Sequence, residues 1–230
     1  MERVNAGADD LVVELGSGTG EIGAHLARLP VRYVGLDSSQ AMLDVFRAKG
    51  VLGSSSLIVA DCNQSWPLPD GSAAVVFASR VIHLLEPEHI TRETLRISRS
   101  AGYLILGRVL RDPDSFKSRL RRRRQELLVE VAITPRQGEE GTRQVIERCL
   151  VAGGQSMGRR VVAEWTDATT PAQIIAGWES LSRMGSVLID PVTRADILDE
   201  LRHWGRTEFG DLDRPEAFRE RYAIDVVRLP

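Results

Sequence analysis

One stretch near the start of the chain, Leu11 to Gly20, constrains the fold more than any other. It reads LVVELGSGTG: an apolar run that ends in Glu14, followed by glycine at every second position, Gly16, Gly18 and Gly20. Such an apolar run is typical of a buried parallel strand. Because glycine has no Cβ, glycines after the strand indicate a sharp turn whose backbone a ligand can approach closely.

The residues after the glycines predict a helix. Within Glu21 to Leu29, the apolar residues Ile22, Leu26 and Leu29 recur at helical spacing. A strand, a glycine loop and a helix in this order form a ligand cradle at a helix N-terminus. Enzymes that bind nicotinamide dinucleotides carry G-x-G-x-x-G, which would place a glycine at position 21. Glu21 therefore argues against that ligand class.

Acidic residues follow the next two predicted strands. The second strand, Arg32 to Leu36, ends in Asp37, and the sequence continues as DSSQAM with Ser38 and Met42. An acid at this position, roughly 20 residues past the first glycine, holds a ribose diol in nucleotide-binding sheets. The third strand, Ser56 to Ala60, is followed directly by Asp61 and Cys62.

Two more strands complete an alternating pattern. LPDGS at Leu68 to Ser72 opens a fourth strand, Ala73 to Phe77, and a fifth reads GYLILG over Gly102 to Gly107. Strands that alternate with helices predict an α/β protein built on a parallel sheet.

These motifs resemble the class I (Rossmann-like) S-adenosylmethionine-dependent methyltransferases of the small-molecule type. The glycine register and DSSQAM carry the resemblance, which implies a seven-stranded, mostly parallel sheet with helices on both faces and strand seven antiparallel. Two positions depart from the family. Ala74 stands where an acid is common, and Ser100 to Gly102 replace Pro-Gly-Gly. Neither position usually touches the cofactor, so the expected fold is unchanged.

The second half of the chain predicts a helical cap inserted between the last strands. We expect one domain, 1–230, with its core at 9–108, 142–166 and 221–230 and cap helices at about 111–132 and 170–205. The cap would cover the carboxyl ends of the strands, where ligands bind in open α/β sheets. The individual expectations are helices at Ser115 to Ala132, Thr142 to Ala152, Ala172 to Met184 and Val192 to Trp204, a loop at Thr134 to Gly141, and strands at Arg160 to Trp165 and Tyr222 to Leu229.

The resemblance also implies a cofactor site. Its expected members are Glu14, Gly16, Ser17, Gly18, Gly20, Asp37, Ser38, Met42, Asp61, Cys62, Ala78 and Ser79. The glycines and Ser17 would shape the loop against the methionine portion, Asp37 would bind the ribose, and Asp61 with the Cys62 backbone would read the adenine edge. Glu14 would orient the loop, Met42 would pack on adenine, and the Ala78–Ser79 backbone would lie near the sulfonium. Helix capping and turn formation are the alternative explanation for Glu14, Asp37 and Asp61, which the position of all three at strand ends beside the glycine loop disfavours.

Methyl transfer requires little chemical assistance from a catalytic residue. Methyl transfer from a sulfonium is an in-line displacement with a neutral leaving group, so the protein has to align the reactants and exclude water. A base is needed only where the acceptor must lose a proton, and His83 is the candidate, because the family often has histidine in this segment. A packing role is the alternative for His83. Ser79-Arg80 stands where the magnesium-dependent catechol enzymes have an acid, and no cluster has metal-ligand spacing, so no metal is expected.

Composition limits the partners. The chain has 230 residues, a net charge of −2 and a pI of about 6.1, which disfavours a nucleic-acid partner. The exception is Arg119 to Arg124, RLRRRR, which is either a solvated helix face balanced by nearby glutamates or a basic rim that steers an anionic substrate. There is no apolar run long enough for a membrane span, no signal-peptide pattern and no disulfide framework, and the cytoplasm is the expected compartment.

Several functions stay open. The leading hypothesis is methyl transfer to an O or N atom of a small molecule, since neither Asn-Pro-Pro-Tyr nor Pro-Cys, the marks of DNA base methylation, occurs. The alternatives are an RNA or protein methyltransferase, a non-catalytic adenosylmethionine-binding module and an NAD(P)-dependent reductase. Only about ten residues precede the first strand, so an N-terminal lid helix is not expected, and a homodimer that supplies the cover is a hypothesis.

Overall fold

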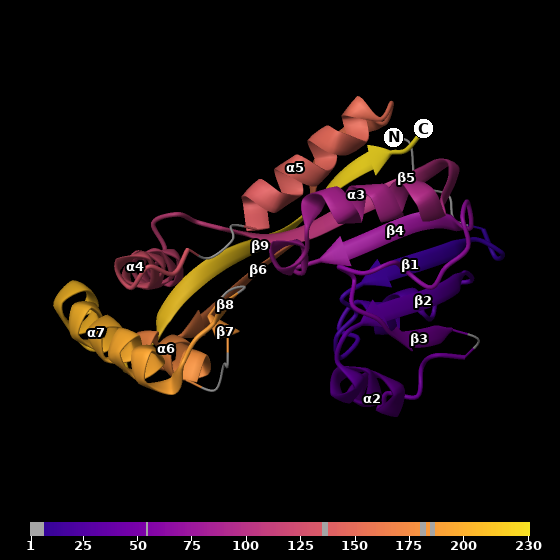
Figure 1. The fold of residues 1–230 in the computed structure, drawn as a ribbon. Helices are drawn as coiled ribbons and strands as arrows, with labels where there is room; N and C mark the ends of the chain where they lie inside the picture. Colours follow the sequence, from indigo (N-terminus) through magenta and orange to yellow (C-terminus); the bar gives the residue numbers. More distant parts are fainter. Residues whose placement is uncertain (1–6, 54, 135–137, 180–182, 185–186) are drawn as a thin grey trace. The chain divides into compact units, whose positions relative to one another are not determined.

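The computed structural model describes residues 7–53, 55–134, 138–179, 183–184 and 187–230 (Figure 1). The first half contains β1 Leu11–Leu15, α1 Gly23–Leu26, β2 Arg32–Asp37, α2 Gln40–Ala48, β3 Ser56–Val59, β4 Ala73–Ser79, the 3-10 helix η1 Ile82–Leu84, α3 Pro87–Ile97 and β5 Ser98–Arg111. The second half contains α4 Phe116–Glu130, α5 Gly138–Val151, β6 Gln155–Thr169, α6 Pro171–Glu179, β7 Arg183–Met184, β8 Val187–Leu188, α7 Pro191–Phe209 and β9 Glu216–Arg228.

Seven strands form the main sheet in the order β3-β2-β1-β4-β5-β9-β6. The strands β1 to β5 pair in parallel. β9 runs antiparallel to β5, since the N–H of Ala101 donates to the Pro230 carbonyl at 3.1 Å and the N–H of Leu229 donates to the Gly102 carbonyl at 2.8 Å. The predicted mostly parallel sheet with an antiparallel last strand is confirmed.

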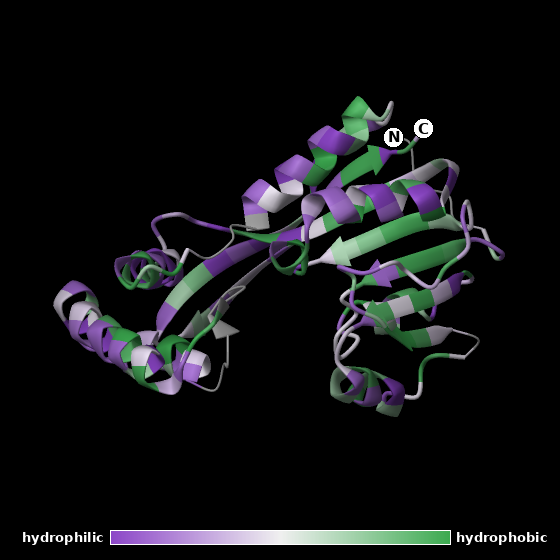
Figure 2. Ribbon diagram, in the orientation of Figure 1, coloured by the Kyte–Doolittle hydropathy of each residue, from purple (hydrophilic) through white to green (hydrophobic). Residues whose placement is uncertain are grey.

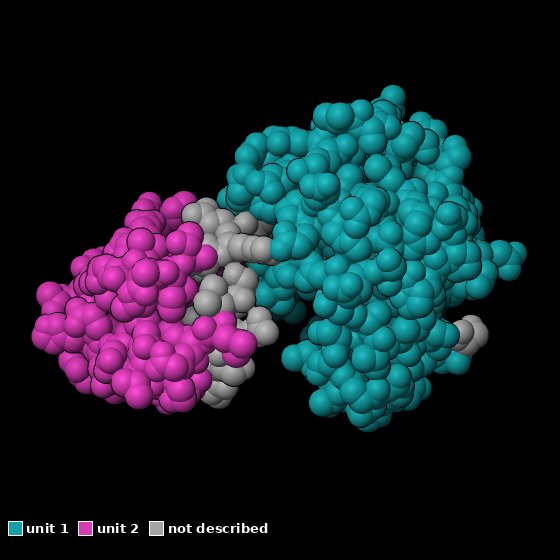
Figure 3. All heavy atoms as spheres, in the orientation of Figure 1, with its two compact units in different colours: residues 1–108, 138–160, 224–230 teal, residues 109–137, 161–223 magenta. Residues whose placement is uncertain are grey.

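The chain divides into two compact units (Figure 3). Unit 1 comprises residues 1–108, 138–160 and 224–230, and unit 2 comprises residues 109–137 and 161–223. Unit 1 holds the parallel strands, and unit 2 holds α4, α6 and α7. That the helices of unit 2 cap the strand ends stays a prediction.

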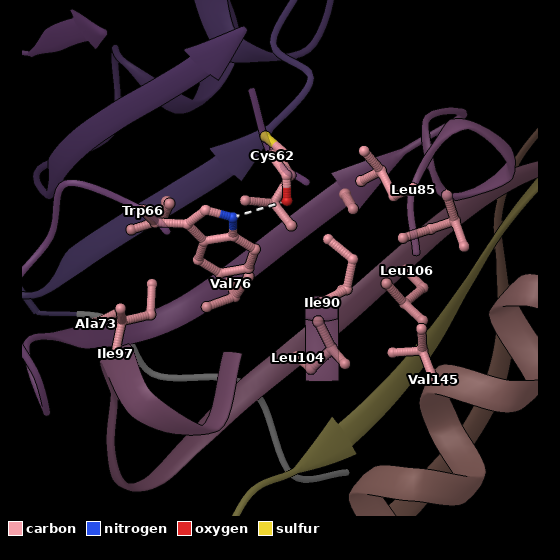
Figure 4. Packing of buried hydrophobic residues seen from close by; sticks show 14 of the residues in the cluster. Cys62, Trp66, Ala73, Val76, Leu85, Ile90, Ile97, Leu104, Leu106 and Val145 are labelled. Carbon is pink, nitrogen blue, oxygen red and sulfur yellow. Dashed lines mark hydrogen bonds between the residues drawn. The ribbon is translucent and has the colours of Figure 1, made fainter. Parts of the chain in front are cut away.

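The core of unit 1 lies on both faces of its strands. All five residues of β1 are buried, as expected for a central parallel strand, and Figure 2 shows the hydrophobic character of β1 and β4. On one face Trp66 packs with residues of α3, β5 and α5, including Ile90, Leu104 and Val145 (Figure 4). On the other face Ala74, 2% exposed, packs in a cluster with Tyr33 and Phe46, so an apolar contact occupies the position where the family often has an acid.

The helix predicted over Glu21 to Leu29 is mostly wrong. Only Gly23–Leu26 is helical, and Leu29 is 51% exposed instead of packing in the core. Pro30 follows Leu29, and proline disfavours helical geometry in the residue before it. The helix also begins at a glycine and lacks a side-chain cap at Ile22, so little stabilises a longer one.

Other boundaries are also corrected. α5 begins at Gly138 within the predicted loop, and its first turn carries Glu139 and Glu140, which favour a helix N-terminus. The predicted helix Ala172 to Met184 ends at Glu179; Leu181 lies outside the described residues, and Met184 belongs to β7.

β5, β6 and β9 extend well beyond their predicted bounds. Their additional residues are largely polar and lack the apolar alternation that marks a strand in a sequence. Charged side chains join these strands across the sheet: Asp225 on β9 accepts from Arg108 on β5 at 3.0 Å and from Arg159 on β6 at 2.9 Å.

Unit 2 has a core of its own around α4, α6 and α7. Its α4 buries Phe116, Leu120, Leu127 and Leu128, as the helical spacing predicts. Val131, expected on the same face, is 44% exposed because α4 ends at Glu130. None of the described helices is long and apolar enough to cross a membrane.

Candidate cofactor site

The glycine loop after β1 combines packing positions with one open position. Gly16, Gly18 and Gly20 all have positive φ, at 65°, 54° and 80°. A Cβ on Gly16 would lie 2.5 Å from Val81 Cγ2, and one on Gly20 would collide with the Phe46 ring. A Cβ on Gly18 would meet only the Met42 sulfur, at 3.9 Å. The outer glycines therefore permit close packing, whereas Gly18 leaves open space beside its backbone.

Asp37 ties the end of β2 to this loop. Its Oδ2 accepts the backbone N–H of Gly18 at 2.8 Å, and its Oδ1 accepts the N–H of Ser39 at 2.9 Å. The Ser39 hydroxyl in turn accepts the N–H of Met42 at 3.3 Å and caps α2. Asp37 therefore forms a turn with Ser39 and also holds the glycine loop. Ser38 is exposed beside it.

Glu14 is buried beneath the loop. It is 3% exposed, and the phenol of Tyr33 donates to its Oε2 at 2.5 Å. Burial raises the pKa of Glu14 to about 7, and the hydrogen bond from Tyr33 acts in the opposite direction. Tyr33 is not predicted as a partner of Glu14, because an aromatic residue on a strand ordinarily serves packing. Ser17 is also buried here, and its hydroxyl lies next to the phenol of Tyr33.

The loop after β3 lies against the glycine loop. Asp61 is exposed, and its Oδ1 accepts the N–H of Asn63 at 2.9 Å, which is an Asx turn. Cys62 is 5% exposed, and burial raises the pKa of its thiol to about 12, against a smaller opposite effect of a hydrogen bond with the Gly16 backbone. The Cys62 thiol is therefore a packing group, and the backbone of this segment is what a ligand can meet.

Two side chains that no sequence motif indicated, those of Asn63 and Trp66, hold the loop after β3 in place. The indole N–H of Trp66 donates to the Cys62 carbonyl at 3.1 Å (Figure 4). The backbone N–H of Trp66 donates to the Glu93 carboxylate on α3 at 2.8 Å. The Asn63 amide donates to the Leu84 carbonyl at 3.2 Å and accepts the N–H of Glu86 at 2.8 Å. No motif in the sequence indicated these contacts of Asn63 and Trp66.

The segment after β4 contributes the remaining predicted residues. Ala78 is fully buried at the end of β4, and Ser79 follows it. Arg80 has a φ of 57°, a conformation unusual for a residue with a side chain, and it turns the chain so that Val81 packs on Gly16. His83 lies in η1 and is half-buried, and burial lowers its pKa, which favours the neutral imidazole at pH 7.

Strand register brings these segments to one edge of the sheet. Leu15 pairs with Leu36 and with Ala78, and Asp37 pairs with Val59. The glycine loop, Asp37, the Asp61–Cys62 turn and Ser79 therefore leave neighbouring strands at the same carboxyl edge. This edge is the usual ligand position in open α/β sheets. Within the described part of the chain, no group of three or more histidine, cysteine or acidic residues is placed to hold a metal ion.

Comparisons with known proteins agree with this geometry. Residues 13–106 match the family model described as a methyltransferase domain. Geranyl diphosphate C-methyltransferase of Streptomyces coelicolor A3(2), solved with Mg²⁺, geranyl diphosphate and S-adenosylhomocysteine, is similar, with a TM-score of 0.53 and 14% identity over 98% of this chain and 76% of that one. No curated protein matches the sequence.

Two bacterial proteins are similar over nearly their whole length. The YcgJ protein of Bacillus subtilis has a TM-score of 0.60 and 18% identity, covering 98% of this chain and 94% of that one. The BH2331 protein of Bacillus halodurans C-125 has a TM-score of 0.62 and 15% identity, covering 99% of this chain and 95% of that one. Residues 13–106 therefore match a methyltransferase domain, and the similar structures share the fold of this chain. The match and the similar structures support an enzyme that uses S-adenosylmethionine as its methyl donor.

Proposed function

We propose that the enzyme transfers the methyl group to an O or N atom of a small-molecule acceptor. The observation that carries the site assignment is the Asp37–Gly18 hydrogen bond beside the open face of Gly18. It sets a fixed acid and a free backbone surface next to each other at the carboxyl edge of the parallel strands.

The residues present fit S-adenosylmethionine. Gly18 offers backbone with space for the methionine portion, and the buried Ser17 lies next to it in the glycine loop. Asp37 retains free lone pairs on both oxygens for ribose hydroxyls after accepting one N–H on each. Met42, 48% exposed, offers an apolar surface for adenine, and Asp61 with the Cys62 backbone offers polar groups for its edge. The bound cofactor supplies an electrophilic methyl group on a sulfonium.

The protein's task is then to position the acceptor and, for a hydroxyl acceptor, to remove its proton. His83 suits that role because burial lowers its pKa and keeps the imidazole neutral, so that it can accept a proton at pH 7. Its place in η1, three residues after the turn at Arg80, puts it close in sequence to the predicted sulfonium end of the site. For an amine acceptor that is already neutral, no base is required.

An acceptor screen tests the function. The enzyme is incubated with S-adenosylmethionine labelled in the methyl group and with pools of phenols, hydroxy acids, amines and isoprenoid diphosphates, the last because one similar structure is a geranyl diphosphate C-methyltransferase. Total RNA and a protein extract are the other arms. We expect label in an O- or N-methylated small molecule, and none with Asp37→Ala. Label found only in carbon, RNA or protein would contradict the proposed acceptor class.

His83 is then examined with the acceptor that the screen identifies. We expect His83→Gln to lower kcat for a hydroxyl acceptor by about 100-fold, the usual contribution of a general base, with the affinity for S-adenosylhomocysteine unchanged. An unchanged kcat would leave His83 with a packing role only.

A further inference from the structure

The arginine run of α4 separates into two groups with different surroundings. Arg123 pairs with Glu126 and Glu130, at 3.2 Å and 3.1 Å, and Arg119 pairs with Glu208. Arg122 is exposed and donates to the Pro113 carbonyl at 3.0 Å. Arg119 and Arg123 are thus balanced by carboxylates and Arg122 is exposed, as one interpretation of the sequence expected.

Arg121 and Arg124 differ from them. Both are half-buried, and the Nε of each is buried without a hydrogen-bond partner. Neither has a hydrogen bond or an ion pair with any residue that the structure describes. Arg108 and Arg123 also have an unpartnered Nε, but their terminal nitrogens are engaged by carboxylates. A cation withdrawn from water is costly unless an anion compensates it.

The position of Arg124 in the helix makes its burial unusual. Phe116, Leu120, Arg124 and Leu128 recur at every fourth residue, and the three apolar members are at most 4% exposed. Arg124 therefore occupies a core position of unit 2, and its guanidinium lies over the ring of Trp178 on α6, 4.3 Å from the centroid. The stacked guanidinium leaves its N–H edges available for an anion.

The charged residues near Arg124 add to the excess of positive charge there. Arg121 lies three residues before Arg124 on the same helical face, and it is close enough to lower the pKa of Arg124, which burial chiefly lowers to about 10. Glu220 lies close to Arg121, but it already accepts from Arg111 at 2.8 Å and from Lys117 at 2.9 Å. Three cationic side chains, Arg111, Lys117 and Arg121, thus share the Glu220 carboxylate, and Arg124 lies close to Arg121 without a carboxylate of its own among the described residues.

We propose that Arg121 and Arg124 form a binding site for an oxyanion, a phosphate or carboxylate group of a small molecule. Two guanidinium groups one helical turn apart can each form a bidentate pair with such a group. The proposal rests on unit 2 alone, and it does not depend on which acceptor atom is methylated. It decides between the two interpretations of RLRRRR in favour of anion binding for these two residues only.

The test titrates inorganic phosphate and, separately, acetate into the full-length protein, with chloride at the same ionic strength as reference. The readouts are the melting temperature and the Nε–H signals of arginine in ¹H–¹⁵N spectra. At a concentration ten times the Kd, we expect the effective anion to raise the melting temperature by about 3 to 5 °C and to shift the Arg121 and Arg124 signals. The anion that acts identifies the phosphate or the carboxylate class.

Three variants separate binding from packing. We expect the anion-induced rise in melting temperature to disappear in Arg121→Gln and Arg124→Met. It should persist in Arg122→Gln, which removes one positive charge from the exposed face of the helix. Arg124→Met keeps the side-chain volume in the core, so the anion-free protein should melt no lower than wild type. A lower melting temperature of Arg124→Met without any anion effect in wild type would show a packing role and overturn the proposal. An equal loss of the anion-induced stabilisation in Arg122→Gln would also overturn the proposal, and so would a wild-type protein that neither anion stabilises. Unchanged S-adenosylhomocysteine affinity in all three keeps this test separate from that of the cofactor site.

Discussion

The carboxylate of Asp37 accepts the backbone N–H of Gly18 at 2.8 Å and so fixes the glycine loop against the end of β2. This contact joins two motifs that lie 19 residues apart in the sequence. It places the ribose-binding candidate directly beside the one glycine of the loop whose Cβ position is open.

Gly18→Ala should weaken cofactor binding much more than it weakens the fold. An added Cβ meets only Met42 within the protein, so the fold bears mainly the backbone cost of an alanine at positive φ, about 1 to 2 kcal/mol. The same methyl group occupies the space assigned to the cofactor, and we expect the affinity for S-adenosylhomocysteine to fall at least about tenfold. Calorimetric titration and thermal unfolding measure the two effects.

Gly71→Ala is the matched control for this substitution. Gly71 also has a positive φ, 62°, and nothing lies within 4 Å of its Cβ position. It should lose similar stability and keep its affinity for S-adenosylhomocysteine. Equal affinity losses in both variants would mean that backbone strain, and not a ligand at Gly18, explains the result.

Glu14 should make the stability depend on pH. Its pKa in the folded protein is about 7, above its ordinary 4.5, so the folded state holds the proton more tightly than the unfolded state does. The stabilisation that this provides is complete below pH 4.5 and is lost as the pH rises through 7, a change of about 3 kcal/mol for a group this buried. The difference in unfolding free energy between wild type and Glu14→Gln, followed from pH 5 to 8.5, isolates this effect.

Tyr33→Phe tests the cause of the shift. The hydrogen bond from Tyr33 lowers the pKa of Glu14, so its removal should raise that pKa further and move the loss of stability to higher pH. A difference curve between wild type and Glu14→Gln that is flat across this range would show that Glu14 titrates normally.

Trp66→Phe should loosen the turn that is assigned to adenine. The substitution keeps an aromatic ring in the core but leaves the buried Cys62 carbonyl without its donor, which costs about 1 to 3 kcal/mol. We expect lower stability and several-fold weaker binding of S-adenosylhomocysteine. Trp204→Phe, a substitution of the same kind in unit 2, should leave the affinity unchanged. Full affinity in Trp66→Phe would show that the hydrogen bond serves the fold alone.

The sequence predicted the parts of this molecule that depend on local pattern. The buried run of β1, the glycine register and the acids at the strand ends are visible because each follows from backbone geometry or from burial. The partners that hold the site are not visible, since Tyr33, Asn63 and Trp66 act through contacts that only the folded chain creates. The long β6 and β9 escaped prediction for a related reason, because ion pairs between strands replace the apolar alternation.

The arginine run shows the same limit from another side. The run RLRRRR by itself is equally consistent with a solvated face and with an anion site, because the six residues alone do not show which arginines face inward. The spacing from Phe116 to Leu128 would have placed Arg124 in the core, and this signal was available before the structure. What the spacing does not show is that the Arg124 guanidinium stacks on Trp178, which lies more than 50 residues later in the chain.

The most direct test of the account is calorimetric titration of S-adenosylhomocysteine into wild type and Asp37→Ala. We predict binding to the wild-type protein and at least about a tenfold loss in the variant, because Asp37 both orients Gly18 and contacts the ribose. Circular dichroism of both proteins provides the check that each is folded. Equal affinity in the folded variant would contradict the assignment of Asp37, and no binding to folded wild-type protein would contradict the cofactor site itself.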